Sequence, residues 1–322
     1  MTRTEQRPVS SGYTAAVTAD DVLLGRSLDG ATALVTGGYS GLGLETTRAL
    51  ARAGARVLVP ARRPDLAAER LSGLPGVEVI PCDLADLASV NTAAQAVLRT
   101  APTLEILIAA GGIMATSERR VGRGWESQFA TNHLGHFALV NHLVEPLANA
   151  EAARVVSYSS AGHHLSDVRW DDMHFEAGYD KWLAYGQAKT ANALFAVHLD
   201  ALGRDAGIAA FSLHPGSIIT ELQRDLTAAE QIERGWIDEH GAVIGEGFKT
   251  AAQGAATGVW AATAPELAER GGVYCEESEV APIAPPGSPI ERGGVRQYAT
   301  DAASARHLWE ASAQMTGIDG FA

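Results

Sequence analysis

Short apolar segments alternate with longer segments of helical periodicity along most of the chain. The apolar segments are rich in β-branched residues and lie at residues 31–36, 56–60, 77–81, 104–110, 154–158, 208–213 and 271–275. Segments of this length and composition are typical of strands buried in a parallel sheet. Because helical segments separate them, the pattern predicts a single doubly wound α/β domain, of Rossmann type, with a seven-stranded parallel sheet.

Two segments fall outside this alternation. Residues 1–27 precede the first strand, and Thr18 to Asp21 has the form of a capping box. We therefore expect an N-terminal extension with a short surface helix and a frayed polar chain before it. Within the main domain, residues 28–322, the segment 221–248 is irregular and rich in glycine. It predicts a lid or substrate loop rather than a separate domain.

A glycine-rich turn directly follows the first strand. Gly37, Gly41 and Gly43 occupy it, and a helical pattern over residues 44–53 comes next. In this context glycines let the backbone approach a pyrophosphate, and the helix N-terminus offers free N–H groups to it. A tight turn needing positive φ would explain one glycine alone. Three glycines in this order favour dinucleotide binding.

The ends of the next two strands indicate how such a dinucleotide would be held. Arg62 and Arg63 follow the second strand, where an acidic residue would instead accept from the 2′-OH of NAD. Guanidinium groups suit a 2′-phosphate, so we predict NADP, with Arg62 as the main contact. Two solvated arginines are the alternative. Asp83 follows the third strand and would either accept from the adenine amino group or cap the next helix.

Tyr185 and Lys189 are four residues apart in a helical pattern and share one helix face. An ammonium close to a phenol lowers the phenol's pKa from about 10 towards neutrality. A tyrosine tuned in this way can exchange a proton with a carbonyl or an alcohol. Ser159 and Ser160 end the fifth strand, at the edge where α/β sheets bind ligands. The sequence alone leaves open which serine faces the ligand.

A long helical pattern over residues 124–149 contains Asn132, which is unfavourable in a helix interior. A polar exposed face and a functional role explain it equally well. His133 and His136 are three residues apart, but no further ligand obviously converges on them. We expect no metal site.

Composition and charge exclude several classes of function. Hydrophobic residues make up 46% of the chain and charged residues 20%, and the formal net charge is −13. This argues against binding of nucleic acid or of an anionic membrane surface. No apolar run approaches the roughly 20 residues that would insert in a membrane, and residues 1–11 lack the apolar core of a signal peptide. Cys82 and Cys275 are too few for a disulfide framework. We expect a cytoplasmic protein.

Taken together, these motifs resemble the short-chain dehydrogenase/reductase family from about Leu28 to Cys275. Residues 36–43 are similar to the family's T-G-x-x-x-G-x-G cofactor turn, and residues 215–220 to its P-G-x-x-x-T turn. The segments 132–137 and 185–192 resemble the retinol-dehydrogenase-like branch, which is mostly NADP-dependent and handles apolar carbonyls and alcohols. At one place the chain departs from the family. Ala109-Ala110 stands where the family usually has two asparagines that brace the sheet.

The resemblance implies a catalytic tetrad of Asn132, Ser160, Tyr185 and Lys189. It also implies an NADP(H) site made of Gly37, Tyr39, Ser40, Gly41, Leu42, Gly43, Arg62, Asp83, Leu84, Ala110, Gly111, Tyr185, Lys189, Pro215, Gly216, Ile218 and Thr220. The expected substrate is a small apolar carbonyl or alcohol, and the aromatic residues of 170–182 and Trp236 suggest its pocket. The family commonly pairs two long helices, here 125–149 and 184–205, so the resemblance implies a homodimer or homotetramer.

Two other functions fit the same motifs. The fold serves many chemistries, so an epimerase or an enone reductase is one alternative. A non-catalytic NADP-binding sensor is the other, although a sensor has no need of Ser160, Tyr185 and Lys189 together.

Overall fold

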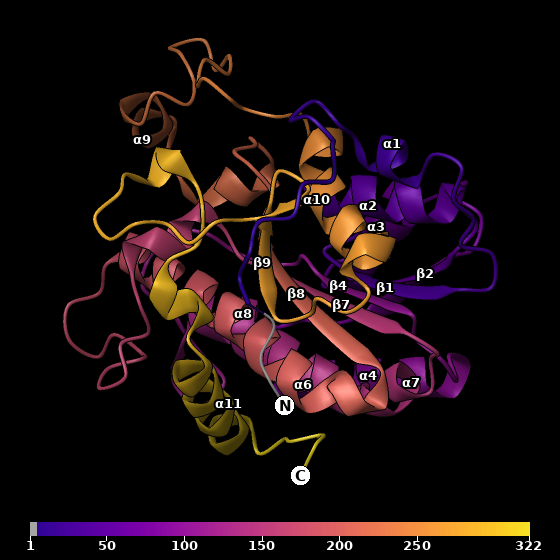
Figure 1. Cartoon of the computed structure of the whole chain (residues 1–322). Coiled ribbons are helices and arrows are strands. Elements are labelled where there is room, and N and C mark those ends of the chain that lie inside the picture. The colour runs from indigo at the N-terminus through magenta and orange to yellow at the C-terminus, as the bar shows by residue number, and fades with distance from the viewer. Residues whose placement is uncertain (1–4) are drawn as a thin grey trace.

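One sheet of eight strands forms the centre of the protein in the computed structural model, which describes residues 5–322 (Figure 1). Its strand order is β10-β9-β8-β7-β4-β1-β2-β3. The seven predicted strands are all present and parallel: β1 (Thr32–Thr36), β2 (Arg56–Ala61), β3 (Val77–Pro81), β4 (Ile106–Ala109), β7 (Ala153–Tyr158), β8 (Ile208–His214) and β9 (Val273–Glu276). The predicted fold class is therefore confirmed.

The eighth strand was not predicted. β10 (Glu279–Val280) pairs antiparallel with β9 through a turn in which Glu277 and Ser278 have φ values of 55° and 58°. Turns with two positive φ values usually carry Gly, Asn or Asp. Neither position of this turn holds one of these residues, so the sequence pattern did not predict the hairpin.

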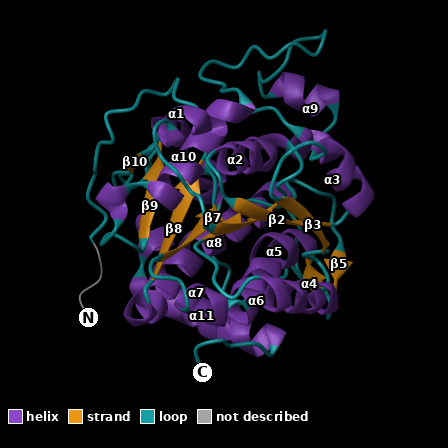
Figure 2. Cartoon of the chain, turned by 90° about the vertical axis from the view of Figure 1, so that its right-hand side faces the viewer, coloured by secondary structure: helices purple, strands orange, loops and turns teal. Residues whose placement is uncertain are grey.

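Helices cover both faces of the sheet (Figure 2). One layer contains α1 (Ala19–Leu23), α2 (Gly41–Arg52), α3 (Pro64–Arg70) and α10 (Ala251–Thr263), and the other contains α4 (Leu87–Thr100), α6 (Gly135–His142), α7 (Val144–Ala148), α8 (Lys181–Gly203) and α11 (Ala302–Thr316). Successive side chains of a strand enter opposite layers. Leu34 and Leu107 pack into the second layer, while Val35 and Ile108 pack into the first. Burial on both faces explains why the strands are apolar throughout.

The helix predicted over residues 124–149 is divided into several elements. It starts with β6 (Trp125–Glu126), which pairs with β5 (Arg120–Val121), and continues as α5 (Ser127–Phe129), a π-helical turn (Ala130–Leu134), α6 and α7. The Glu126 carboxylate accepts from the N–H groups of Gln128 and Phe129, which starts the helix later than predicted. Pro146 cannot donate to the carbonyl four residues back, which accounts for the break between α6 and α7.

The N-terminal extension packs on the sheet edge. The capping box at Thr18 is confirmed, but Val22 and Leu23 of α1 are buried, so α1 is not a free surface helix. The Gln6 side chain accepts from the N–H of Tyr274 at 2.9 Å and donates to its carbonyl at 2.8 Å. The prediction of frayed chain is therefore wrong at Gln6 and at Val9, which forms an antiparallel bridge with Val280 of the outermost strand β10. Residues 1–4 of the predicted frayed chain lie outside the described residues.

The last helix covers part of the layer formed by α6 and α8. Trp309 stacks on Phe195 with ring centroids 5.7 Å apart and meets Phe137 edge-on at 4.8 Å. Next to it, the N–H of Gly320 donates to the Asn141 side chain at 2.8 Å. The two helices that the resemblance pairs between subunits are thus in contact with α11 of the same chain.

Across the described residues, no helix is long and apolar enough to span a membrane. The same residues contain no group of three or more His, Cys, Asp or Glu side chains that could hold a metal ion. Cys82 and Cys275 are both buried, free thiols.

Candidate active site

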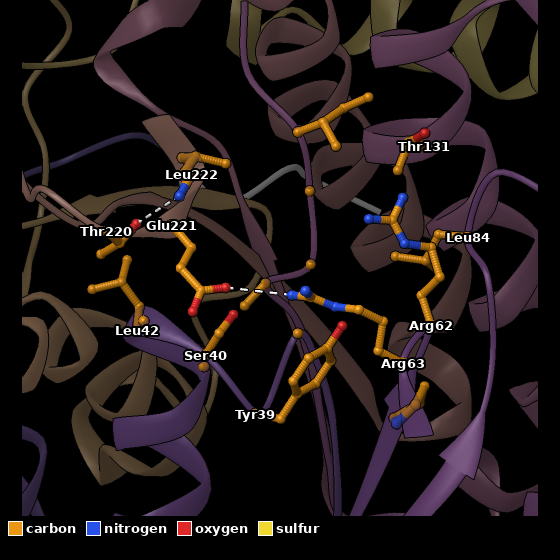
Figure 3. A pocket seen from close by; sticks show the side chains of 18 of the residues that line it. Tyr39, Ser40, Leu42, Arg62, Arg63, Leu84, Thr131, Thr220, Glu221 and Leu222 are labelled. Atoms are coloured by element: carbon orange, nitrogen blue, oxygen red, sulfur yellow. Dashed lines mark hydrogen bonds and ion pairs between the residues drawn. The ribbon is translucent and has the colours of Figure 1, made fainter. Parts of the chain in front are cut away.

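A pocket opens at the carboxyl ends of β1 to β4, where parallel strands place their following loops together (Figure 3). Most of the predicted cofactor residues line it: Gly37, Tyr39, Ser40, Gly41, Leu42, Gly43, Arg62, Asp83, Leu84, Ala110, Gly111 and Thr220. The remaining ones lie outside this lining: Tyr185 and Lys189 on α8, and Pro215, Gly216 and Ile218 on the connection from β8 to Thr220. Arg63, which the sequence offered beside Arg62, also lines it, and so do residues that sequence reasoning missed: Thr131, Glu221, Leu222 and Arg224.

Close backbone packing shapes the floor of the pocket. A Cβ at Gly43 would lie 2.3 Å from the Gly37 carbonyl oxygen, and one at Gly37 would lie 2.9 Å from Gly111 Cα. Gly37 and Gly41 have φ values of 67° and 51°, which L side chains rarely adopt. The Ser40 side chain precedes α2 but does not cap it. The first N–H groups of this 12-residue helix are therefore available to donate to a ligand. This cradle fits a pyrophosphate.

The two arginines after β2 have different partners. Arg63 lies 3.4 Å from the Glu221 carboxylate, which also pairs with Arg70 at 2.6 Å. Arg62 lines the pocket and has no hydrogen bond or ion pair with any described residue. In Figure 3 the Arg63 side chain extends to Glu221, whereas Arg62 extends towards Leu84. The guanidinium of Arg62 is therefore the more available of the two to a phosphate.

Asp83 lies in the pocket lining but does not cap the following helix. Its carboxylate accepts from the Ala85 N–H at 2.9 Å and closes a local turn. Asp86 is the residue that caps α4, through the N–H of Ala88 at 2.9 Å. Of the two uses considered for Asp83, helix capping is thus wrong.

Ser160 is the serine that faces Tyr185. Its hydroxyl accepts from the Gly162 N–H at 3.0 Å, and the Ser160 hydroxyl and the Tyr185 ring both lie within 3.4 Å of the position that a Cβ at Gly162 would take. Ser159 instead donates to the main-chain carbonyl of Lys189 at 2.7 Å. The Lys189 ammonium donates to the carbonyl of Tyr158 at 2.9 Å and lies 5.6 Å from the centroid of the Tyr185 ring.

The electrostatics of this group differ from those predicted. Burial raises the pKa of Tyr185 to about 12, and the nearby Ser160 side chain offsets only part of that rise. Burial also lowers the pKa of Lys189 to about 8. The predicted fall in the Tyr185 pKa towards neutrality is therefore wrong for this structure. Burial destabilises the phenolate form of Tyr185 by more than the Lys189 ammonium, which is bonded to the Tyr158 carbonyl, stabilises it.

Asn132 braces the chain that follows β4. Its side chain is fully buried, accepts from the Ile113 N–H and donates to the Ile113 carbonyl, both at 2.9 Å. Its own carbonyl accepts from His136 Nδ1 at 2.9 Å. The alternative of an exposed polar face is thus wrong, and the π-helical turn is where Asn132 is accommodated.

Thr36 and His136 hold the backbone that directly follows Ala109-Ala110. Thr36 Oγ1 accepts from the Gly111 N–H at 2.9 Å and bonds His136 Nε2 at 2.8 Å. Since His136 Nδ1 donates to a carbonyl, its Nε2 is the acceptor for the Thr36 hydroxyl. Burial lowers the His136 pKa to about 4, which keeps the ring neutral. His136 is a structural residue that the sequence did not identify.

Apolar side chains surround Tyr185 on the side of the segment 221–248. Tyr185 clusters with Met114 and Leu226, and Leu222, Trp182 and Trp236 pack against this cluster. The segment forms a short 3-10 turn and α9 (Ala228–Glu233), which lies at the margin of the molecule in Figure 1.

Charged groups tie this segment to α8. Lys181 pairs with Glu230 of α9, and the Arg234 guanidinium lies 3.7 Å from the Trp182 ring centroid. Both partners on α8 lie in its first turn, three to four residues before Tyr185. The segment is thus anchored directly beside Tyr185.

Comparisons with known proteins agree with this geometry. The family model for short chain dehydrogenase matches residues 31–231. A "probable oxidoreductase" of Streptomyces lividans is 42% identical over 88% of this chain and 96% of its own length, and human retinol dehydrogenase 14 is 32% identical over 90% and 88%. A crystal structure of an uncharacterized protein from Mycobacterium paratuberculosis has a TM-score of 0.72 and 31% identity, covering 97% of this chain and 100% of that one.

The match to the family model spans well over half of the chain, and the relatives are aligned over nearly all of it. Proteins of this family use NAD(P)(H). The chain therefore belongs to the short-chain dehydrogenase/reductase family of oxidoreductases, and its relatives include retinol dehydrogenases.

Proposed function

We propose that this protein is an NADP(H)-dependent oxidoreductase that interconverts an apolar ketone or aldehyde with the corresponding alcohol. The observation that carries the proposal is the position of the Ser160 hydroxyl beside the Tyr185 ring, one helical turn from Lys189 and within the apolar cluster. Leu222 packs against that cluster and also lines the dinucleotide pocket, so the two sites adjoin. When bound, the nicotinamide supplies or accepts the hydride.

The side chains of the chain itself then handle the proton and the developing charge. Tyr185 gives its phenolic proton to the substrate oxygen in reduction and takes it back in oxidation. The high pKa of Tyr185 keeps the phenol protonated at neutral pH, which suits it to reduction. Ser160 donates to the same oxygen and stabilises the charge that develops there. We assign Lys189 to the nicotinamide ribose hydroxyls and Asn132 to a water of the proton relay.

The pocket residues support NADP over NAD. Arg62 directly follows β2 and lines the pocket, where its guanidinium would suit a 2′-phosphate, whereas an acidic residue at this position would accept from the ribose 2′-OH of NAD. We assign Asp83 to the adenine amino group, and Pro215, Gly216 and Ile218 to the nicotinamide side. The substrate is proposed to lie against Met114 and the lid side chains.

The homodimer or homotetramer stays a prediction, as does a cytoplasmic location. Pairing through α6 and α8 would have to accommodate α11, whose Trp309 is buried against that layer. Sedimentation of the full-length protein measures its mass directly.

Fluorescence titration with NADPH and NADH, followed by a panel of apolar ketones and aldehydes, tests the proposal. We expect tighter binding of NADPH and oxidation of the bound nucleotide when a carbonyl is added. Tight binding with no turnover across the panel would favour a sensor. Reduction of an enone that leaves its carbonyl intact would favour an enone reductase. No binding of either nucleotide would contradict the proposal as a whole.

A further inference from the structure

Two imidazoles hold one peptide group, the one that joins Ser160 to Ala161. His163 Nδ1 lies 2.6 Å from the carbonyl oxygen of Ser160. On the opposite side of this peptide, the N–H of Ala161 donates to His214 Nδ1 at 3.1 Å. The orientation of this peptide sets ψ of Ser160, which is 159°, and therefore the direction in which its hydroxyl is presented.

The hydrogen bonds also identify the tautomer of each ring. The main-chain N–H of Arg296 donates to His163 Nε2 at 3.1 Å, so Nε2 is an acceptor and the proton is on Nδ1. His163 therefore donates to the Ser160 carbonyl. His214 Nδ1 accepts from Ala161, so its proton is on Nε2. Burial lowers the pKa of both rings to about 3, and both are neutral.

His163 is itself held by the C-terminal segment, residues 281–298, which we term the strap. The Tyr298 hydroxyl donates to the His163 carbonyl at 2.6 Å, and His164 Nε2 donates to the Gly294 carbonyl at 2.9 Å. The Arg296 guanidinium donates to the Pro285 carbonyl at 2.7 Å and so folds the strap on itself. The strap thus reaches the turn that follows Ser160.

We propose that His163 and His214 are positioning residues, which fix the Ser160–Ala161 peptide and thereby aim the Ser160 hydroxyl at Tyr185 and the substrate oxygen. The inference rests on the proposed function, because it assigns these rings to the reduction of a carbonyl. Neither ring is proposed to touch the substrate. Their effect on the reaction passes entirely through Ser160.

A double-mutant cycle in the full-length protein tests this route of action. His163→Leu, Ser160→Ala and the double variant are compared by kcat for carbonyl reduction and by NADPH affinity. We expect His163→Leu to lower kcat by roughly 10- to 100-fold, the size of a misplaced catalytic group, with little change in NADPH affinity. In the Ser160→Ala background the same change should lower kcat no further.

Conservative variants show whether a loss of kcat comes from the lost hydrogen bonds or from the lost packing of the ring. Asparagine offers an amide N–H close to the position of imidazole Nδ1 and an oxygen acceptor close to the same place. His163→Asn and His214→Asn should therefore recover most of the kcat that the corresponding leucine variants lose. Wild-type kcat in His163→Leu would overturn the proposal, and so would an equal loss from this change with and without the Ser160 hydroxyl.

A measurement on the unaltered protein covers variants that fail to fold. The 15N chemical shifts of the ring nitrogens report each tautomer, and we expect the proton on Nδ1 of His163 and on Nε2 of His214. The opposite tautomer at either ring would overturn the proposal. If the wild-type enzyme reduces no carbonyl, the proposed function fails, while the tautomers still show whether the two rings hold this peptide.

Discussion

The two halves of the candidate active site are built in different ways. The dinucleotide half is a pocket whose lining includes glycines and charged side chains, with Arg62 exposed and unpaired among the described residues. The catalytic half is buried. Hydrogen bonds to main-chain groups fix the side chains of Ser160, Lys189 and Asn132. An exposed charge contributes little to the energy of the fold, whereas a buried polar group without its partner is costly. Changes in the buried half should therefore have the larger effects.

The largest effect is expected for Tyr185→Phe, which removes the proton donor and leaves the buried ring in place. We expect kcat to fall by roughly 10²- to 10⁴-fold, the usual contribution of a positioned acid or base. NADPH affinity should stay within a few-fold, since the dinucleotide pocket is lined by other residues. Single-turnover reduction and a binding titration measure the two quantities. A variant that keeps most of its activity would contradict the assignment of Tyr185.

Gly162→Ala tests whether the buried half tolerates displacement. A Cβ at this position would lie 2.7 Å from Tyr185 Cε1, so the phenol ring has to move. A shift of about 1 Å costs on the order of 100-fold in rate, and we expect a loss of kcat of that size.

The matched control is Gly178→Ala. A Cβ at Gly178 would meet no atom within 4 Å, but the φ of 73° at this position makes alanine strained. This control should lose stability without losing kcat, and thermal unfolding together with kcat distinguishes the two variants. Equal kcat in both glycine variants would show that the catalytic half is more adaptable than its packing indicates.

The same contrast explains what could be predicted from the sequence. The dinucleotide half depends on local features, so its glycines and the arginines after β2 were identified from their places along the chain, and the family resemblance supplied most of its other residues. Among the lining residues that were missed is Glu221, which meets Arg63 and Arg70 from 158 and 151 residues away in the chain. Pairings at such separations leave no local pattern.

The catalytic half depends on tertiary contacts that spacing does not encode. The four-residue spacing of Tyr185 and Lys189 pointed to Tyr185, and the family resemblance agreed, but the direction of its pKa shift follows from burial, which that spacing does not reveal. Similarly, His163 meets the strap 133 residues further along the chain. The π-helical turn around Asn132 exists because this side chain reaches the backbone of Ile113.

Arg62→Ala tests the open half. The loss of a charge-assisted hydrogen bond to the 2′-phosphate should weaken NADPH binding by about 1.5–3 kcal/mol, near the lower end because the site is exposed. NADH binding should not change. Arg63→Ala is the comparison, because Arg63 already pairs with Glu221 and should affect NADPH less. Equal weakening of NADPH and NADH by Arg62→Ala would exclude the 2′-phosphate role.

The smallest effect is a pH dependence that originates in the buried half. Burial holds the pKa of Lys189 at about 8, below its ordinary value, so the ammonium loses its proton as the pH rises through that range. Tyr185 remains protonated there because its pKa is about 12. The kcat/KM for carbonyl reduction should therefore be level below the Lys189 pKa and fall above it, by at most about tenfold per pH unit for one group. A pH profile with saturating NADPH measures this fall in kcat/KM. If kcat/KM instead stays level until the pH approaches the Tyr185 pKa, the Lys189 charge does not support the reaction. The buried half would then depend on Ser160 and Tyr185 alone.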